Sequence, residues 1–385
     1  MIDWTSNDTE VLLNPRLPES EGLRLRRLVK DSPSFNAHIW LATSGSSGRI
    51  KMVALSKDAF LASAASANRH METSNADRWG LVLPRFHVGG LSIFARAFLS
   101  HSEVLELPKW SAPDFAGWCT SEKVTLSSLV SAQLTDLVRM NLRAPAHLRA
   151  VLLGGGGVSK DLYSRARALG WNILPTYGMT ECGSQVATAP VNSLLQEEYP
   201  ELMMLPHLEA RVETDGRLAF RGSSLLTGYA FEEVSGVARF EDPKRLGWFI
   251  SEDQGEVKTG PGGARQLLLL KGRGTDFIKI GGESVGLPRL DQALEKVWND
   301  LYSTAQVGWD AALVAYPDER LGSVIHLVVA GASESFVEQI VEAFNSEVLP
   351  FEKIRAVHRL PELPRSSLGK ILRPEILKTL GVQRT

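Results

Sequence analysis

The stretch Thr43-Ser44-Gly45-Ser46-Ser47-Gly48-Arg49-Ile50-Lys51 combines hydroxyls, glycines and an ammonium directly after the apolar run 39–42. Glycine backbones turn tightly and expose their N–H groups, so such a segment can leave a strand and cradle a polyanion. The G-x-x-x-x-G-K-[ST] spacing of a Walker A loop is absent. We therefore predict a phosphate-binding loop of another type, against the alternative of a flexible Ser/Gly-rich turn.

The composition is that of an ordinary soluble protein. The chain has 385 residues, 44% of them hydrophobic and 22% charged, which is enough for two or more cores. Its formal net charge of −2 gives no electrostatic basis for binding nucleic acid or an anionic membrane. Cys119 and Cys182 fit a reducing compartment. With neither a signal peptide nor a membrane-spanning apolar run visible, we expect a cytoplasmic protein without membrane insertion.

Short apolar runs alternate with amphipathic patterns between residues 37 and 177, which predicts a largely parallel sheet flanked by helices. The predicted strands are 39–43, 79–84, 126–130, 150–153 and 173–175, and the predicted helices are 56–70, 132–141 and 159–169. From about residue 206, short strands separated by turn residues predict a small antiparallel sheet or barrel. After Gly281-Gly282, a mixed helix and strand pattern predicts a separate domain, with the boundary near Asp276.

Residues able to bind a nucleotide follow two of the predicted strands. Tyr177-Gly178-Met179-Thr180-Glu181 places an aromatic face, a hydroxyl and a carboxylate where ligands collect in open α/β sheets. The Glu181 carboxylate suits Mg²⁺, which prefers oxygen ligands. The glycines 154–157, with Gly155 and Gly156 at their centre, would let a flat ring approach the backbone. A plain strand-to-helix turn is the alternative for the glycines.

His87 and Lys370 can each be interpreted either as a catalytic residue or as an ordinary polar side chain. His87 lies where a predicted strand passes into a Gly-loosened helix, whereas a lone histidine is usually a satisfied polar group. Lys370 lies at the tip of a turn set by Pro364 and Gly369. Its ammonium could stabilise charge that develops on a phosphate, whereas a lone exposed lysine would be ordinary.

Six motifs, spread in order over residues 37–375, resemble those of the acyl-adenylate-forming superfamily of acyl-CoA synthetases, luciferases and peptide-synthetase adenylation domains. They are the segments 43–51, 83–91, 177–181, 247–253, 271–283 and 363–373. The resemblance implies an α/β adenylate-forming fold, with a large domain at 1–275 and a small mobile α+β domain at 276–385. Residues from about 206 to 275 would form a β-barrel-like subdomain of the large domain.

The resemblance also implies roles for individual residues. The residues implied to bind ATP are Thr43, Ser44, Gly45, Ser46, Ser47, Gly48, Lys51, Gly155, Gly156, Tyr177 (on adenine), Gly178, Thr180 (on the α-phosphate), Glu181 (through Mg²⁺), and Asp253 and Arg273 (on the ribose). Asp276 would be the hinge, and Lys279, Gly281 and Gly282 would line the thioester-forming site. Lys370 would be the catalytic lysine, and Phe86 and His87 would lie beside the acyl pocket.

Within the superfamily, the Tyr177–Glu181 motif followed by Ser184-Gln185, together with Phe-His-x-x-Gly-Leu-Ser from residue 86, most resembles o-succinylbenzoate–CoA ligases of menaquinone synthesis. This implies an AMP-forming acid–thiol ligase that uses ATP, Mg²⁺ and coenzyme A on a small carboxylic acid. Phe86, His87, Ser184 and Gln185 would bind that acid, with Arg85 as an added anchor. An acyl-CoA or aryl-CoA ligase of other specificity, or a truncated nucleotide-binding homologue without activity, is the alternative. A homodimer stays open.

Three features depart from the family's pattern. Arg85 stands where the family commonly has an apolar residue. Family members usually carry a much longer segment before the phosphate loop. Glu252 stands where the family usually has glycine before the ribose-binding aspartate, and it adds negative charge beside Asp253.

Overall fold

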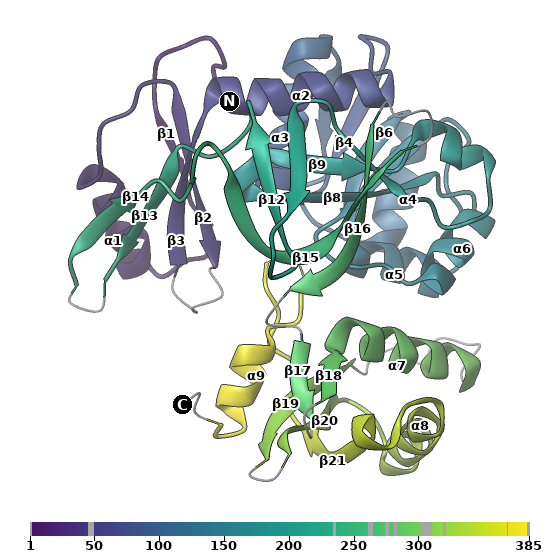
Figure 1. Cartoon of the computed structure of the whole chain (residues 1–385). Helices are drawn as coiled ribbons and strands as arrows, with labels where there is room; N and C mark the ends of the chain where they lie inside the picture. The colour runs from purple at the N-terminus through teal and green to yellow at the C-terminus, as the bar shows by residue number, and fades with distance from the viewer. Residues whose placement is uncertain are drawn as a thin grey trace.

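The computed structural model describes residues 2–44, 50–233, 236–260, 265–273, 277–280, 283–301, 310–318, 321–367 and 369–382. The chain forms a large upper body and a smaller lower body, which contains the elements from β17 onward (Figure 1).

One long mixed sheet organises the upper body. From β8 to β5 its strands are parallel, as the alternating sequence pattern predicts. The other strands pair antiparallel. The strand order is β11 (Leu208–Val212), β12 (Arg217–Gly222), β15 (Phe249–Thr259), β16 (Gln266–Arg273), β10 (Leu202–Met204), β9 (Ser184–Thr188), β8 (Ile173–Met179), β7 (Ala150–Gly154), β6 (Leu126–Val130), β4 (Arg78–Leu81) and β5 (Glu103–Glu106).

Helices cover both faces of the parallel strands. Residues of α2 (Lys57–Met71) and α3 (Val88–Ser100) pack on one face, in a core with Trp79. Residues of α4 (Ala112–Ser121), α5 (Ser131–Arg139) and α6 (Lys160–Ala168) pack on the other, in a core with Phe115 and Trp171. Ser56 and Ser159 cap α2 and α6, because each hydroxyl accepts a backbone N–H of the first turn. The sequence therefore predicts the start of these two helices within one residue.

A second sheet contains the strands on both sides of the phosphate loop. Its order is β1 (Glu10–Leu12), β2 (His38–Ser44), β3 (Ile50–Ser56), β13 (Gly228–Glu232) and β14 (Ala238–Glu241), and α1 (Glu19–Lys30) packs on it. The segment expected to form a barrel-like unit is therefore divided. Its strands β13 and β14 join this second sheet, whereas β11, β12, β15 and β16 extend the long sheet.

The lower body has its own core. Its elements are β17 (Phe277–Ile280), β18 (Glu283–Gly286), α7 (Leu287–Leu301), β19 (Asp310–Asp318), β20 (Gly322–Ala330), α8 (Glu334–Glu347), β21 (Ile354–Arg359) and α9 (Arg373–Thr379). Apolar residues of α7 and α8 pack on one face of the β19–β20–β21 sheet, and Ile376 of α9 packs on the other. This matches the mixed pattern expected after residue 282. The expected hinge, Asp276, lies outside the described residues.

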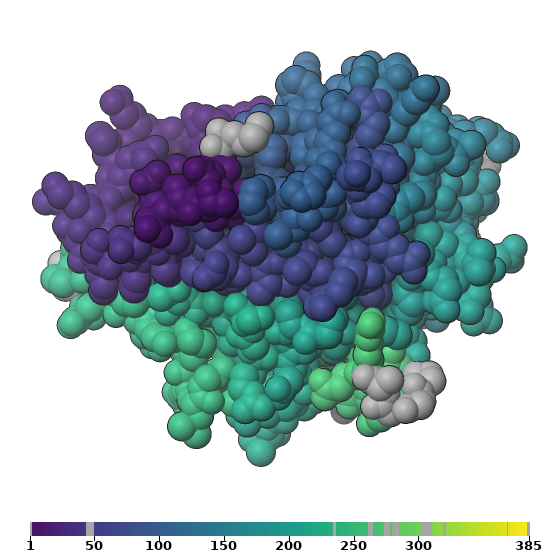
Figure 2. All heavy atoms as spheres, turned by 90° about the horizontal axis from the view of Figure 1, so that it is seen from above, coloured from purple at the N-terminus to yellow at the C-terminus, as the bar shows by residue number. Residues whose placement is uncertain are grey.

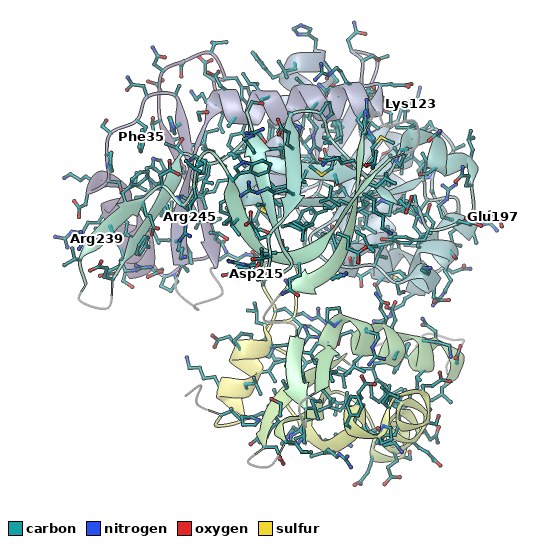
Figure 3. All side chains as sticks on the ribbon, in the orientation of Figure 1. Phe35, Lys123, Glu197, Asp215, Arg239 and Arg245 are labelled. Atoms are coloured by element: carbon teal, nitrogen blue, oxygen red, sulfur yellow. The ribbon has the colours of Figure 1, made fainter. Side chains whose placement is uncertain are left out.

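The start of the chain is anchored on the upper body. Lys57 Nζ donates to the carbonyl oxygens of Asp3 and Ser6 at 2.6 and 2.9 Å, and the Trp4 ring lies 5.8 Å from that of Phe60. In the space-filling view the dark purple first residues lie flat against this surface (Figure 2). Asp215, in the β11–β12 turn, lies at the lower edge of the upper body in the view of Figure 3.

Candidate active site

The candidate site lies at the carboxyl edge of the parallel strands. Parallel neighbours end on the same side of a sheet, so the segments that leave β4, β6, β7 and β8 emerge together. In that order they carry His87, Ala132, Gly155 and Glu181. The sheet topology thus brings three of the predicted site segments to one edge.

The glycines after β7 present bare backbone. Gly155 has a φ of +78°, and an added Cβ would lie 3.0 Å from Val130 Cγ1, so this position requires glycine. At Gly156 the nearest atom to an added Cβ would be Ser131 Oγ at 3.9 Å, and at Gly157 nothing lies within 4 Å. The open peptide surface leaves room for a flat ring; the adenine-binding role of Gly155 and Gly156 stays a prediction.

The Tyr177 motif is placed differently from the sequence expectation. Strand β8 continues to Met179, so Tyr177 is a strand residue and not part of an exposed turn. Its ring is buried near Phe220, and its hydroxyl donates to Asp253 Oδ2 at 2.6 Å. The two residues expected around a nucleoside are therefore in direct contact. Burial, followed by the nearby Asp253 charge, raises the pKa of Tyr177 well above its usual value.

Gly178 lies where β8 and β9 approach most closely. An added Cβ would lie 2.1 Å from the carbonyl oxygen of Ser184, at a bulge between the two strands. Only glycine fits there. The close approach holds the following turn, Thr180–Cys182, against β9.

Glu181 is held by a tyrosine that none of the motifs includes. Tyr229 Oη donates to Glu181 Oε1 at 2.9 Å, and Leu226 N donates to the Glu181 carbonyl oxygen at 2.8 Å. Burial raises the pKa of Tyr229, and the charges of Glu181 and Glu252 add to this effect. The Tyr229 hydroxyl therefore stays protonated and remains a donor to the carboxylate.

The donor set around Glu181 fits magnesium. Thr180 and Glu181, both partly exposed, offer the hydroxyl and carboxylate oxygens that Mg²⁺ prefers. The neighbouring Cys182 is fully buried, and burial raises the pKa of its thiol well above its usual value, so it stays a neutral side chain. Among the described residues, no cluster of three or more His, Cys, Asp or Glu side chains forms a metal site. Binding through one protein carboxylate plus phosphates is the usual arrangement for this ion.

The phosphate loop joins two antiparallel strands. Thr43 of β2 pairs in register with Lys51 of β3. The loop residues Gly45, Ser46, Ser47 and Gly48 lie outside the described residues, and Ser44 is described in its backbone alone. Lys51 Nζ lies 5.1 Å from the ring centroid of Tyr229. The end of the loop is thus next to the Glu181 turn.

Asp253 and Arg273, both expected at the ribose, are opposite each other in the register of β15 and β16. Glu252, the departure from the family's glycine, is exposed.

Lys279, expected at the thioester-forming site, is described in its backbone alone, opposite Ser284 in the β17–β18 hairpin. Gly281 and Gly282 lie outside the described residues. Their thioester-site role stays a prediction.

His87 and its neighbours begin helix α3. His87 is the residue before this helix, and its Nε2 lies 2.7 Å from Ser367 Oγ of the lower body. Burial lowers its pKa, so the ring is neutral at physiological pH. The Phe86 ring lies 4.7 Å from the His87 ring.

Arg85, the expected added anchor, is exposed. Its guanidinium forms an ion pair with the carboxylate of Glu106 on β5.

The cation next to Ser184 is Arg96 of α3, which the motifs do not include. Arg96 is 2% exposed, and its Nη2 donates to Ser92 Oγ at 3.0 Å and Ser184 Oγ at 3.4 Å. Within the described part of the chain, Nε and Nη1 have no hydrogen-bond partner. Burial lowers its pKa to about 9, so the guanidinium still carries its charge at neutral pH. The sequence signal was available, because Arg96 is the one charged residue of this apolar helix.

Gln185 is buried in a different environment from Ser184. Its amide nitrogen donates to Thr188 Oγ1 at 2.7 Å and to Thr176 Oγ1 at 3.3 Å, which links β8 and β9. Successive strand residues face opposite sides of a sheet. Ser184 therefore approaches α3, whereas Gln185 joins the hydroxyls of the strand pair.

Lys370 belongs to a hairpin that reaches from the lower body to the site. Arg365 pairs with Ile371 across it, and Arg365 is held by a bidentate ion pair with Asp310 at 2.7 Å. An added Cβ on Gly369 would lie 3.2 Å from Ala132 Cβ, at the start of α5. Together with the His87–Ser367 contact, this places the hairpin at the carboxyl edge of the sheet; its yellow trace rises to the upper body in Figure 1.

Comparisons with known proteins agree with this geometry. The AMP-binding enzyme family model matches residues 10–230. The chain is 29% identical over 350 residues to a 2-succinylbenzoate–CoA ligase of Bacillus cytotoxicus, covering 88% of this chain and 69% of that protein. It is 28% identical over 347 residues to the protein of the same name from Bacillus mycoides, covering 87% of this chain and 69% of that one.

Solved structures show the same fold. The o-succinylbenzoate CoA synthetase of Bacillus subtilis, in complex with the acyl-adenylate OSB-AMP, aligns with a TM-score of 0.73 at 24% identity, covering 90% of this chain and 69% of that chain. The fold is that of adenylate-forming enzymes. No described helix is long and apolar enough to cross a membrane. Since the family model matches more than half of the chain, this protein belongs to the AMP-binding enzyme family.

Proposed function

We propose that this chain is an ATP-dependent o-succinylbenzoate–CoA ligase. In the first half-reaction a substrate carboxylate oxygen attacks the α-phosphorus of ATP, which forms the acyl adenylate and releases pyrophosphate. In the second, the thiol of coenzyme A attacks the acyl carbon, which forms the thioester and releases AMP. The names of the relatives that align with 87–88% of the chain support this choice of acid and thiol.

The observation that carries the choice of acid is the buried, unpaired Arg96 beside Ser184. A buried charge is costly unless it gains a partner, and Arg96 has no ion-pair partner among the described residues. A substrate with a second carboxylate would supply that partner, through charge-assisted hydrogen bonds to the guanidinium and the Ser184 hydroxyl. A fatty acid or a simple benzoate has no such group to offer.

The predicted residues fit the chemistry of the first half-reaction. Bound Mg²⁺ would neutralise phosphate charge, with Glu181 as the residue to hold it, and Thr180 would contact the α-phosphate. The ammonium of Lys370 would stabilise the charge that develops at the α-phosphate. Asp253 and Arg273 would hold the ribose, the glycines 154–157 the adenine, and Lys51 the phosphates. Asp276 would be the boundary between domains 1–275 and 276–385.

Location and assembly are part of the proposal. Both cysteines are free and buried, which fits a protein of a reducing compartment such as the cytoplasm. A homodimer would be detected as a doubled mass in light scattering.

The proposed acid is tested by competition among acids. We expect kcat/KM for pyrophosphate release with o-succinylbenzoate to exceed that with benzoate or a medium-chain fatty acid by roughly 10⁴-fold, because a site built to bind a polar group rejects analogues that lack it. Mass spectrometry should detect the matching CoA thioester. If a fatty acid or benzoate is the better substrate, the choice of acid is wrong; if no acid releases pyrophosphate, the ligase assignment is wrong.

A further inference from the structure

Tyr229 connects two parts of the candidate nucleotide site that are far apart in the sequence. It lies on β13, which pairs antiparallel with β3, so that Tyr229 is opposite Val53. Its hydroxyl donates to Glu181 Oε1 at 2.9 Å. Strand β3 starts at the end of the phosphate loop, and Glu181 follows β8. One side chain thus touches both segments.

The ring of Tyr229 contacts the cation at the end of the loop. Lys51 Nζ lies 5.1 Å from the Tyr229 ring centroid and 5.9 Å from that of Phe231. Both distances are within the range of a cation–π interaction, which orients an ammonium without neutralising its charge. These contacts restrict the position of the Lys51 ammonium.

The backbone around Tyr229 is fixed by close contacts. An added Cβ at Gly228 would lie 2.4 Å from Phe240 Cζ and 2.6 Å from the Glu241 carbonyl oxygen. Thr227 N donates to the Ala54 carbonyl oxygen at 2.8 Å, and Leu226 N donates to that of Glu181 at 2.8 Å. These contacts tie the segment before Tyr229 to β3 on one side and to the Glu181 turn on the other. The hydroxyl thus has little freedom to move relative to the carboxylate.

We infer that Tyr229 is a positioning residue of the Mg²⁺·ATP site: its hydroxyl orients the Glu181 carboxylate toward the cation, and its ring orients Lys51 toward the phosphates. The inference rests on the proposed function, because it requires Mg²⁺·ATP to bind at Glu181. A hydrogen bond to one carboxylate oxygen fixes the plane of the group and leaves the other oxygen for the metal. Partners of this kind commonly change metal affinity when they are removed.

The two contacts can be separated by two substitutions. Tyr229→Phe removes the hydroxyl and keeps the ring, whereas Tyr229→Leu removes both. ATP binding is measured by titration calorimetry over a series of Mg²⁺ concentrations, without acid or coenzyme A. For Tyr229→Phe we expect the half-saturating Mg²⁺ concentration to rise about 10-fold or more. ATP affinity in EDTA should match the parent's for Tyr229→Phe and be lower for Tyr229→Leu.

Tyr163→Phe is the matched control. Tyr163 is a buried tyrosine of α6, and its hydroxyl has no hydrogen-bond partner among the described residues, so the parent Mg²⁺ dependence is expected. An unchanged Mg²⁺ dependence in Tyr229→Phe overturns the inference while the proposed function stands. A parent protein that binds no ATP at any Mg²⁺ concentration contradicts the proposed function, and this inference with it.

Discussion

At the scale of single residues, Arg85 and Arg96 differ in the partners of their guanidinium groups. Arg85 is exposed and ion-paired with Glu106, and an exposed pair of this kind contributes little to stability. Arg96 is buried with two hydroxyls as its hydrogen-bond partners among the described residues, and it lies 5.4 Å from the Trp79 ring centroid. A charge without an ionic partner in the interior lowers the stability of the fold. Functional sites commonly contain residues that reduce stability in this way.

Arg96→Met should therefore change specificity without loss of stability. We expect kcat/KM for o-succinylbenzoate to fall by roughly 100-fold or more, since a buried charge-assisted contact is lost. The rate with benzoylpropionate, the same acid without the ring carboxylate, should not fall. The melting temperature should equal or exceed the parent's, because a buried unpaired charge is removed. Steady-state kinetics with both acids and a thermal melt measure these effects.

Arg85→Met is the matched control for this experiment. Because Arg85 is engaged with Glu106, its removal should leave the preference for the dicarboxylate unchanged. A loss of preference in Arg85→Met, with parent behaviour in Arg96→Met, would assign the anchoring role to Arg85, as the sequence interpretation had it.

At the scale of elements, the Lys370 hairpin is preorganised by its own contacts. Ser366 N donates to the Lys370 carbonyl oxygen at 2.8 Å, and Lys370 N donates to Ser366 Oγ at 3.1 Å. The Arg365–Asp310 pair ties the hairpin to the start of β19. If Lys370 is the catalytic lysine, a hairpin fixed in this way would position its ammonium before substrate binds, and charge stabilisation is most effective when the charge is positioned in advance.

Lys370→Ala should impair one half-reaction far more than the other. Acid-dependent pyrophosphate release should fall by on the order of a hundredfold or more, as for the loss of one preorganised charge. Thioester formation from presynthesised acyl adenylate should stay near the parent rate, because Lys370 is expected to reach the α-phosphate in only one orientation of the domain that carries it. Equal losses in both half-reactions would refute this role.

The elements that sequence reasoning predicted well have strong local signals. Strand β6 is predicted at its observed bounds, 126–130, and α2 and α6 begin directly after their serine caps. The extension of β8 through Tyr177 and Met179 was missed, because it depends on pairing with β9 and not on local pattern. Likewise, Arg96 and Tyr229 reach the site through contacts with residues 88 and 48 positions away in the sequence. No periodicity or motif encodes such contacts, although the single charge of the apolar helix α3 singles out Arg96 itself.

At the scale of the whole molecule, hydrogen bonds between described residues join the lower body to the upper body at the two places that follow. One is the Lys370 hairpin at His87 and Ala132. The other joins α7 to α6, where Asn299 Nδ2 donates to Asp161 Oδ2 at 2.8 Å and Asn299 Oδ1 accepts from Arg165 Nη1 at 3.1 Å. Each place has hydrogen bonds between polar side chains, which is typical of interfaces between domains of one chain. This orientation brings the hairpin of Lys370 to the edge at which ATP is proposed to bind.

The central claim, that the chain activates its acid as an enzyme-bound acyl adenylate, is tested most directly by a single turnover. The protein is mixed in excess with ATP labelled at the α-phosphate and with o-succinylbenzoate, without coenzyme A, quenched in acid and analysed by mass spectrometry. We predict that the label accumulates as o-succinylbenzoyl-AMP with release of pyrophosphate, and that added coenzyme A converts it to the thioester and free AMP. Formation of ADP and phosphate, or label that stays in ATP while the acid is bound, would contradict the account.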